Sequence, residues 1–298
     1  MSFGYQVLGF GSGAEAVTGN ANGIFGFGES GVTAVTNLVS DVGVIGTDVT
    51  GVGTARSRLG ACGYGEDKGI FAYGKTSSNV SMSNLVSNAG VVATDVTGVG
   101  TARSYVAACT YGGDKGIFGY GEPGYVGMTN LVSNAGVVAT DVTGVGTARV
   151  DPSACEYGTG LGIFGYGNPG YLSMTNLVTN GGVVGTDVTG VGTGRYTLAA
   201  CSYGYDKGIF GFGYTGSDTA VTNLVSNVGV VATDTAGVGT ARHELAATQY
   251  AGDKGIFGYG TTGSEVSLTN LVSNAGVVAT DTTGVGTARQ TSSACSFN

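Results

Sequence analysis

Tryptophan is missing from this chain of 298 residues, and histidine occurs once, as His243. One imidazole cannot supply a copper site that needs two, and it leaves no credible Ser/His/Asp set for nucleophilic catalysis. Charged residues make up only 11% of the chain, with 12 Lys and Arg against 20 Asp and Glu. A net charge of -8 without a basic cluster predicts binding neither to nucleic acid nor to an anionic membrane surface.

Long apolar runs are also missing. No window approaches the roughly 20 apolar residues of a transmembrane helix, so we expect no membrane insertion. The opening residues, MSFGYQVLGFGSG, have neither the basic segment nor the long apolar stretch of a secretory signal. From the sequence we therefore expect no signal peptide.

The cysteines are few and do not form a disulfide pattern. All occupy one position of a repeat, at which Thr248 stands in another copy: Cys62, Cys109, Cys155, Cys201 and Cys295. An odd number without a CxxC pair favours small buried strand residues over disulfides or metal ligands. We expect neither a metal site nor a cofactor.

What the chain does contain is a repeat. The phenylalanine of GIF recurs every 46 or 47 residues, at Phe25, Phe71, Phe118, Phe164, Phe210 and Phe257. A period of this length indicates a solenoid, a propeller or an array. Each copy is rich in Gly, Val, Thr, Tyr and Phe and shows no apolar spacing of 3.6 residues, which excludes helical repeats.

One unit reads as four short strands. Residues 104–111 contain small residues, as expected for the inner strand of a propeller blade; 116–121 form the second strand, with Phe118 and Tyr120 on one face. Residues 128–133 and 137–141 form the third and fourth strands, joined by a turn at Gly136. We therefore predict an all-β, six-bladed propeller over residues 23–298, with four antiparallel strands per blade. The C-terminal strand would join the first blade and close the ring. Residues 1–22 would form an arm or a degenerate partial blade. If they form a blade, the propeller would have seven blades.

The segments GTAR, AACTYGGDK, GIFGYG, TNLVSN and GVVATD occur in this order in the unit, which resembles a kelch-like β-propeller repeat. The unit departs from the kelch pattern, with GYG in place of the glycine doublet and valine in place of tryptophan. Its near-verbatim repetition is similar to that of the repetitive propellers in structural and tail-fibre proteins of aquatic bacteriophages. This resemblance implies a virion component, or otherwise a cytoplasmic protein.

Two charged positions recur in every unit and would form rings in a propeller. They are Asp48, Asp95, Asp141, Asp187, Asp234 and Asp281, with Arg56, Arg103, Arg149, Arg195, Arg242 and Arg289. A carboxylate ring could hold calcium and a guanidinium ring could hold anions. We favour a structural role, in which each pair satisfies amides of the crossing segment, because buried charges are usually paired.

The copies differ most in two connections that an antiparallel blade places on one face: those between strands two and three, and those following each arginine. This variable face is the predicted binding surface. It carries several tyrosines, whose flat rings and hydroxyls suit sugar rings or a protein partner. Its candidate residues are Tyr105, Glu122, Tyr125, Tyr171, Tyr196, Tyr214, Asp218, His243 and Glu244.

We therefore expect a protein that is not an enzyme. It would be a virion structural or receptor-binding module that presents the variable face to a host-surface glycan or to a neighbouring virion protein. Two alternatives stay open. One is a kelch-type scaffold for protein–protein interaction. The other is a glycan-processing enzyme, which requires two carboxylates that occur in only one part of the variable face.

Overall fold

The computed structural model describes residues 22–297. The predicted arm or partial blade at residues 1–22 lies, apart from Asn22, outside the described residues. Every regular element in residues 22–297 is a β-strand, so the all-β prediction is confirmed. No helix in this part of the chain is long and apolar enough to cross a membrane.

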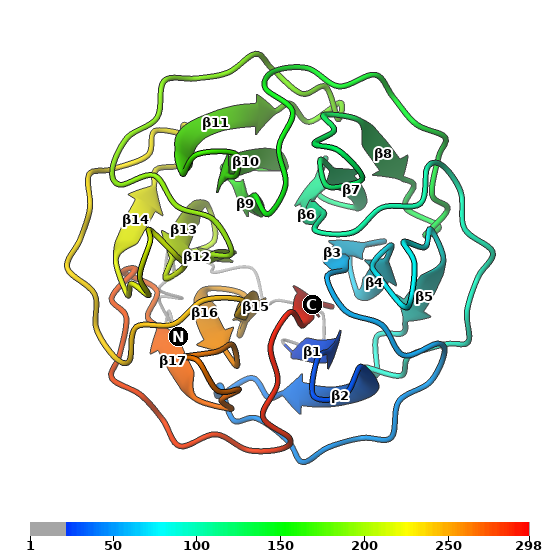
Figure 1. Cartoon of the computed structure of the whole chain (residues 1–298), viewed down its shortest axis with the longest axis horizontal. Coiled ribbons are helices and arrows are strands. Elements are labelled where there is room, and N and C mark those ends of the chain that lie inside the picture. The colour runs from blue at the N-terminus through cyan, green and yellow to red at the C-terminus, as the bar shows by residue number, and fades with distance from the viewer. Residues whose placement is uncertain (1–21, 298) are drawn as a thin grey trace, which may run out of the picture.

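The described strands form six antiparallel sheets of three strands each. The inner strands are β3 (Gly60–Tyr64), β6 (Ala107–Tyr111), β9 (Ser153–Tyr157), β12 (Ala199–Tyr203), β15 (Ala246–Tyr250) and β18 (Ser293–Ser296). The middle strands are β1 (Gly23–Gly28), β4 (Lys68–Ala72), β7 (Lys115–Gly119), β10 (Leu161–Gly167), β13 (Lys207–Gly211) and β16 (Lys254–Gly258). The outer strands are β2 (Thr33–Val39), β5 (Ser83–Val86), β8 (Thr129–Val132), β11 (Leu172–Val178), β14 (Thr222–Val225) and β17 (Thr269–Val272). Figure 1 shows the sheets set around one axis, in a propeller-like arrangement with the inner strands nearest that axis.

The last described strand lies in the same sheet as the first. Strand order in this sheet is β18-β1-β2, with Gly23 opposite Ser296 and Gly26 opposite Ser293. Segments from the two ends of the described chain therefore share one hydrogen-bonded sheet, as Figure 1 also shows.

The predicted fourth strand is not a regular strand. In the sheet of β6, β7 and β8, the segment after Gly136 meets β8 only through isolated bridges, Thr129 with Val142 and Val132 with Val138. Ala139 N donates to Leu131 O, and Val142 N donates to Thr129 O, both at 2.8 Å. Three residues therefore oppose two, which is a bulge that interrupts the ladder. The side chain of Asn130 takes over part of the pairing, since its Nδ2 donates to Ala139 O at 3.0 Å.

Adjacent sheets pack closely because glycine faces a larger side chain across each gap. A Cβ atom added to Gly116 would lie 2.5 Å from the Sγ of Cys62 in the preceding sheet. One added to Gly119 would lie 2.9 Å from the ring of Phe164 in the following sheet. The cysteines are all free and buried, so the prediction that they are small buried strand residues is confirmed.

The second aromatic residue of each unit, at or just after the end of the middle strand, does not continue the strand alternation. Tyr120 has φ of 65°. The angle lies between 61° and 65° at its counterparts, which are Phe27, Tyr73, Tyr166, Phe212 and Tyr259. Tyr120 therefore contacts Phe164 of the following sheet, whereas Phe118 contacts Tyr73 of the preceding sheet. The prediction that Phe118 and Tyr120 share one face is wrong, because the left-handed backbone turns the second ring to the other side.

Candidate functional site

The recurrent arginines are held inside the protein framework. All six are fully buried, and each guanidinium lies 3.9 to 4.6 Å from the centre of an aromatic ring. Arg149 shows the pattern, since its Nη1 donates to Thr147 O and its Nη2 donates to Asn176 Oδ1. Burial lowers the pKa of Arg56 and of Arg242 to about 10, although a neighbouring aspartate opposes the shift in each case.

The recurrent aspartates link neighbouring units. Asp141 accepts hydrogen bonds from the backbone N–H and the hydroxyl of Thr101, which belongs to the preceding unit, and its Oδ1 lies 3.6 Å from Arg103 Nη1. Burial raises the pKa of this carboxyl, but the bonds from Thr101 and Asn130 and the charge of Arg103 outweigh it, so the pKa is lowered. The same threonine bonds recur at Asp48, Asp95, Asp187, Asp234 and Asp281. Each recurrent aspartate is therefore engaged in contacts between neighbouring units.

Five of the predicted binding residues lie together. The ring of Tyr171 lies 5.6 Å from that of Tyr196, which lies 5.8 Å from Tyr214, which in turn lies 5.2 Å from His243. His243 Nδ1 is 2.7 Å from Asp218 Oδ1, so the row ends in a His–Asp pair. We call Tyr171, Tyr196, Tyr214, His243 and Asp218 the tyrosine row.

Two other predicted residues lie outside the row. The carboxylate of Glu122 accepts a hydrogen bond from Ser104 Oγ at 3.0 Å and lies 3.6 Å from Lys75 Nζ. Tyr125 is 45% exposed. The structure therefore divides the predicted set, and the remaining two residues, Tyr105 and Glu244, line a pocket on the axis.

This axial pocket begins at the second residue after each recurrent arginine. The six residues there are Arg58, Tyr105, Asp151, Thr197, Glu244 and Thr291, which we call the mouth ring. All six have left-handed backbones, with φ between 52° and 58°. Backbone bonds link several neighbours, as from Tyr105 N to Arg58 O and from Glu244 N to Thr197 O. The framework is thus uniform while its side chains differ.

Left-handed backbone is costly at such positions, by about 1–2 kcal/mol for a residue with a side chain. Strain of this kind is a reason to look for function where it is observed. Sequence reasoning selected Tyr105 and Glu244 but missed Arg58, Asp151, Thr197 and Thr291. The signal was present, because this position, two residues after each recurrent arginine, holds a different residue in nearly every copy.

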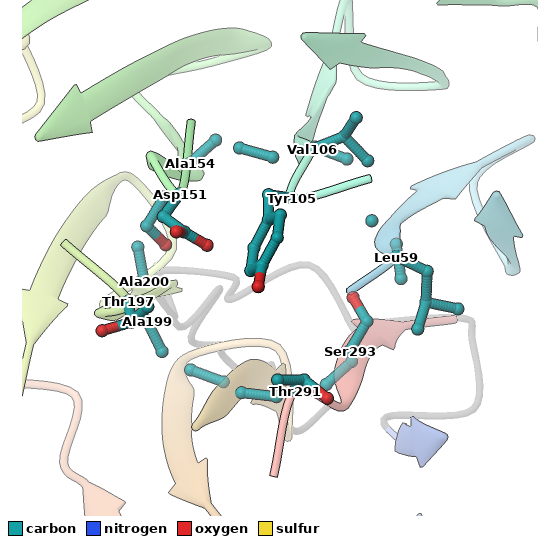
Figure 2. A pocket seen from close by; sticks show the side chains of 18 of the residues that line it. Leu59, Tyr105, Val106, Asp151, Ala154, Thr197, Ala199, Ala200, Thr291 and Ser293 are labelled. Atoms are coloured by element: carbon teal, nitrogen blue, oxygen red, sulfur yellow. The ribbon is translucent and has the colours of Figure 1, made fainter. Parts of the chain in front are cut away.

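The pocket has a volume of about 130 Å³, roughly ten times what a single buried water needs. Its wall below the mouth ring consists of small residues of the inner strands, such as Ala108, Ala154 and Ala200. Figure 2 shows the hydroxyl of Tyr105 extending toward the middle of the pocket, with Asp151 and Thr291 among the residues around it. The pocket therefore offers an apolar floor and a polar rim.

Both carboxyls of the pocket have raised pKa values. Burial raises the pKa of Asp151 well above its usual range, and the charge of Glu244 adds to this, while Arg58 opposes it. Burial also raises the pKa of Glu244, although His243 and Arg58 act in the other direction. Tyr105 lies among the same charges, and its pKa is raised, chiefly by burial. The mouth ring is thus one coupled electrostatic cluster.

Several buried polar atoms at the pocket have no hydrogen-bond partner within residues 22–297. They are Arg58 Nε, Thr291 Oγ1 and Ser292 Oγ. Arg58 is otherwise engaged, since its Nη2 lies 3.3 Å from Glu29 Oε1 and its guanidinium lies over the ring of Tyr105. A buried polar group without a partner costs about 1–3 kcal/mol, so these atoms are suited to a ligand.

A smaller cavity of about 60 Å³ lies along the other half of the inner strands. It is lined by the buried cysteines and by polar residues that differ between copies, among them Thr110, Glu156, Ser202 and Gln249. Burial raises the pKa of Glu156 to about 7, and a hydrogen bond from Gly160 N acts against the shift. This cavity therefore holds a carboxyl that titrates near neutrality.

Comparison with known proteins supplies a fold and no family. No protein-family model matches the sequence, and no curated protein matches it. The structure is similar to that of a fungal alcohol oxidase of the AA5 family, solved in complex with copper. The TM-score is 0.58 with 15% sequence identity, over 91% of this chain and 64% of the oxidase chain. This chain therefore spans less than two thirds of that protein, and at this identity the likeness concerns the fold alone.

The likeness contradicts the prediction that the chain is not an enzyme. A solved structure with a similar fold is an alcohol oxidase, so the fold gives no ground for excluding catalysis. Copper itself does not fit the residues present here. His243 is the sole histidine of the chain, and within residues 22–297 no group of three His, Cys, Asp or Glu side chains is placed to hold a metal ion.

Proposed function

We propose that this chain is a carbohydrate-binding module that recognises a glycan through the tyrosine row. The observation that carries the proposal is the unbroken series of ring contacts from Tyr171 to His243, across three neighbouring sheets. Tyrosine presents a flat apolar face with a hydroxyl at its edge, which suits stacking on a sugar ring and bonding to its substituents. Asp218, paired with His243, adds a hydrogen-bond acceptor at the end of the row.

The row is accessible as well as continuous. Tyr171 is 43% exposed, and Tyr196, Tyr214 and His243 are partly exposed. Backbone bonds between Tyr196 and Tyr214 hold the two side chains on one platform, with Tyr214 N donating to Tyr196 O at 3.0 Å. A rigid platform loses little conformational entropy when a ligand binds, which favours affinity.

The proposed architecture is a closed six-bladed propeller in which the outer segment of each unit serves as an irregular fourth strand. Pairing of β18 with β1 supports closure, and the isolated bridges beside each outer strand support the fourth segment. The resemblance of the repeat to phage propellers leads us to propose the virion as its location and a host-surface glycan as its target. Detection of the chain by mass spectrometry in purified, washed virus particles tests that location, and its absence from them would reject it.

Binding to a bacterial glycan array tests the function. We expect selective binding by the wild-type chain, and a loss of at least tenfold in Tyr171→Ala and Tyr214→Ala. The matched control is Tyr205→Ala. Tyr205 is 65% exposed and lies in the turn after β12, at the opposite end of the strands from the row. If all three variants bind like the wild type, or the folded chain binds no glycan, the proposal is rejected.

Glycan processing is a second candidate, favoured by the carboxyls of Asp151 and Glu244. Among the six mouth-ring positions only these two carry carboxyls, so they are not part of the repeat framework. In hydrolysis the acid, Asp151, would protonate the leaving oxygen as the glycosidic C–O bond breaks. Glu244 would take a proton from the water whose oxygen bonds to the anomeric carbon.

Incubation with array-positive glycans and analysis of reducing ends tests this second candidate. We expect new reducing ends with the wild type and at least a hundredfold slower release with Asp151→Asn. Intact glycans after prolonged incubation with the wild type would leave binding alone as the function.

A further inference from the structure

The mouth ring alternates in chemistry around the axis. Inner strands contact one another in the order β3, β6, β9, β12, β15, β18 and back to β3, so the ring order follows the chain. The charged residues Arg58, Asp151 and Glu244 occupy every second position. The intervening positions all carry hydroxyls, on Tyr105, Thr197 and Thr291. A ligand on the axis therefore meets a hydroxyl between any two charges.

This combination selects against simple ions. An anion would meet two carboxyls, and a cation would meet the unpartnered Nε of Arg58, which can only donate. The free hydroxyls of Thr291 and Ser292 can donate or accept. A ligand that matches this set must itself carry several groups that both donate and accept around one compact ring, and sugar hydroxyls have that property. The apolar floor of alanines suits the C–H face of such a ring.

We propose that the axial pocket receives the terminal sugar residue of a glycan end-on, while the tyrosine row holds the residues that follow. This proposal rests on the proposed glycan-binding function and adds that recognition begins at a chain end. In the bound state Arg58 Nε donates to a sugar oxygen, and Asp151 and Glu244 exchange hydrogen bonds with sugar hydroxyls. With a volume of about 130 Å³, the pocket has room for one sugar residue.

Two members of the row are next to mouth-ring residues along the chain. Tyr196 precedes Thr197 of the mouth ring, and His243 precedes Glu244. Burial raises the pKa of Tyr196, and the neighbouring Tyr171 and Tyr214 of the row and then Asp151 and Glu244 of the pocket raise it further. This proximity places both surfaces within reach of one glycan.

Capped probes test end-on recognition. The probes are linear hexasaccharides of glucose, galactose, mannose and N-acetylglucosamine, each with free or methyl-capped hydroxyls on the non-reducing terminal residue, titrated by calorimetry. We expect capping to weaken binding of the preferred hexasaccharide at least tenfold, because the methyl groups remove donors and do not fit among buried polar atoms. Equal affinity for free and capped probes overturns the proposal.

Variants of the unpartnered hydroxyls provide a second measurement. Thr291→Val and Ser292→Ala remove groups that the free protein leaves unsatisfied, so the thermal midpoint should stay unchanged or rise while affinity for the preferred hexasaccharide falls several-fold. A residue with a purely structural role would show the opposite result, with a lower midpoint and unchanged affinity.

The outcomes separate the two proposals. If Tyr214→Ala loses hexasaccharide binding while capping and the Thr291 and Ser292 variants have no effect, the row binds glycan and the pocket does not. If the wild type binds neither the hexasaccharides nor the corresponding free monosaccharides, measured by saturation-transfer NMR, both proposals fall.

Discussion

Thr287 donates its backbone N–H and its hydroxyl to the carboxylate of Asp48, with 2.6 Å between Oγ1 and Oδ2, across 239 residues of chain. The same contact joins Thr101 to Asp141 across only 40 residues. Each is a charge-assisted hydrogen bond that holds a connecting segment of one unit against the neighbouring unit. The contact of Asp48 with Thr287 thus makes the last unit a neighbour of the first, in the same manner as any consecutive pair.

Asp48→Ala should destabilise the fold by about 2–3 kcal/mol, because it leaves Thr287 without its acceptors and removes a charge near Arg289. Urea denaturation measures the change. Asp141→Ala is the matched variant, and we expect a similar cost. A cost for Asp48→Ala far below that of Asp141→Ala would contradict a closed ring.

Arg149→Gln should cost about 3–5 kcal/mol, because it removes a buried donor from Thr147 O and Asn176 Oδ1 and takes away the cation that lies 4.0 Å from Asp187 Oδ1. The lost contact with the ring of Tyr120 adds to this. Urea denaturation of the variant and of Lys75→Gln, which changes a partly exposed cation, gives the comparison. Similar midpoints for the two variants would contradict the structural role of the arginine ring.

Gly116→Ala should lower stability by about 1–3 kcal/mol, because the new methyl group overlaps the Sγ of Cys62. Cys62→Ala alone leaves a small cavity, yet in the double variant it makes room for the methyl group. We expect the double variant to lose less stability than the summed losses of the two single variants. Additive effects would show that the two residues do not share one packing contact.

Stability should fall as pH rises because of Glu156. Its pKa in the folded protein is raised from 4.5 to about 7, so the folded state binds the proton more tightly than the unfolded chain. The stabilisation is complete below the unfolded pKa and is lost as pH rises through about 7. The shift corresponds to roughly 3 kcal/mol at most.

Glu156→Gln tests this dependence, because the amide oxygen can still accept from Gly160 N. We expect the variant to lose the part of the pH dependence between about 4.5 and 7 and to be more stable than the wild type at pH 8. Parallel stability curves for the two proteins over this range would show that Glu156 ionises as freely in the folded state as in the unfolded chain.

The cysteines should resist alkylation in the folded protein. Burial raises the pKa of Cys201 and of Cys295 to about 12, and the reactive thiolate is therefore scarce at pH 8. Mass spectrometry after treatment with iodoacetamide should show no modification before urea is added and five modified cysteines afterwards. Rapid modification without urea would indicate opening of the inner strands.

Much of the fold could be predicted from the sequence because the same strand and turn residues recur in every unit. Spacing of Phe118 and its counterparts, with branched residues between glycines, was enough to predict an all-β chain of similar units. Cys62 and its counterparts could be predicted as buried because a small residue recurs there. The segment predicted as a regular fourth strand, residues 137–141, pairs irregularly instead, because the hydrogen bond from Asn130 to Ala139 and the bulge beside it depend on contacts between strands that periodicity does not encode.

For the site, the sequence by itself determined which positions vary, and that pointed to Tyr105, Tyr171, Tyr196, Tyr214, His243 and Glu244. Only the tertiary structure decided which of them meet. Arg58, Asp151 and Thr291 lie far apart along the chain, yet the inner strands bring them to one pocket. The physical reason is that the units are arranged around one axis, which brings equivalent positions of different units close together. A residue that differs in one copy therefore becomes part of a shared polar ring.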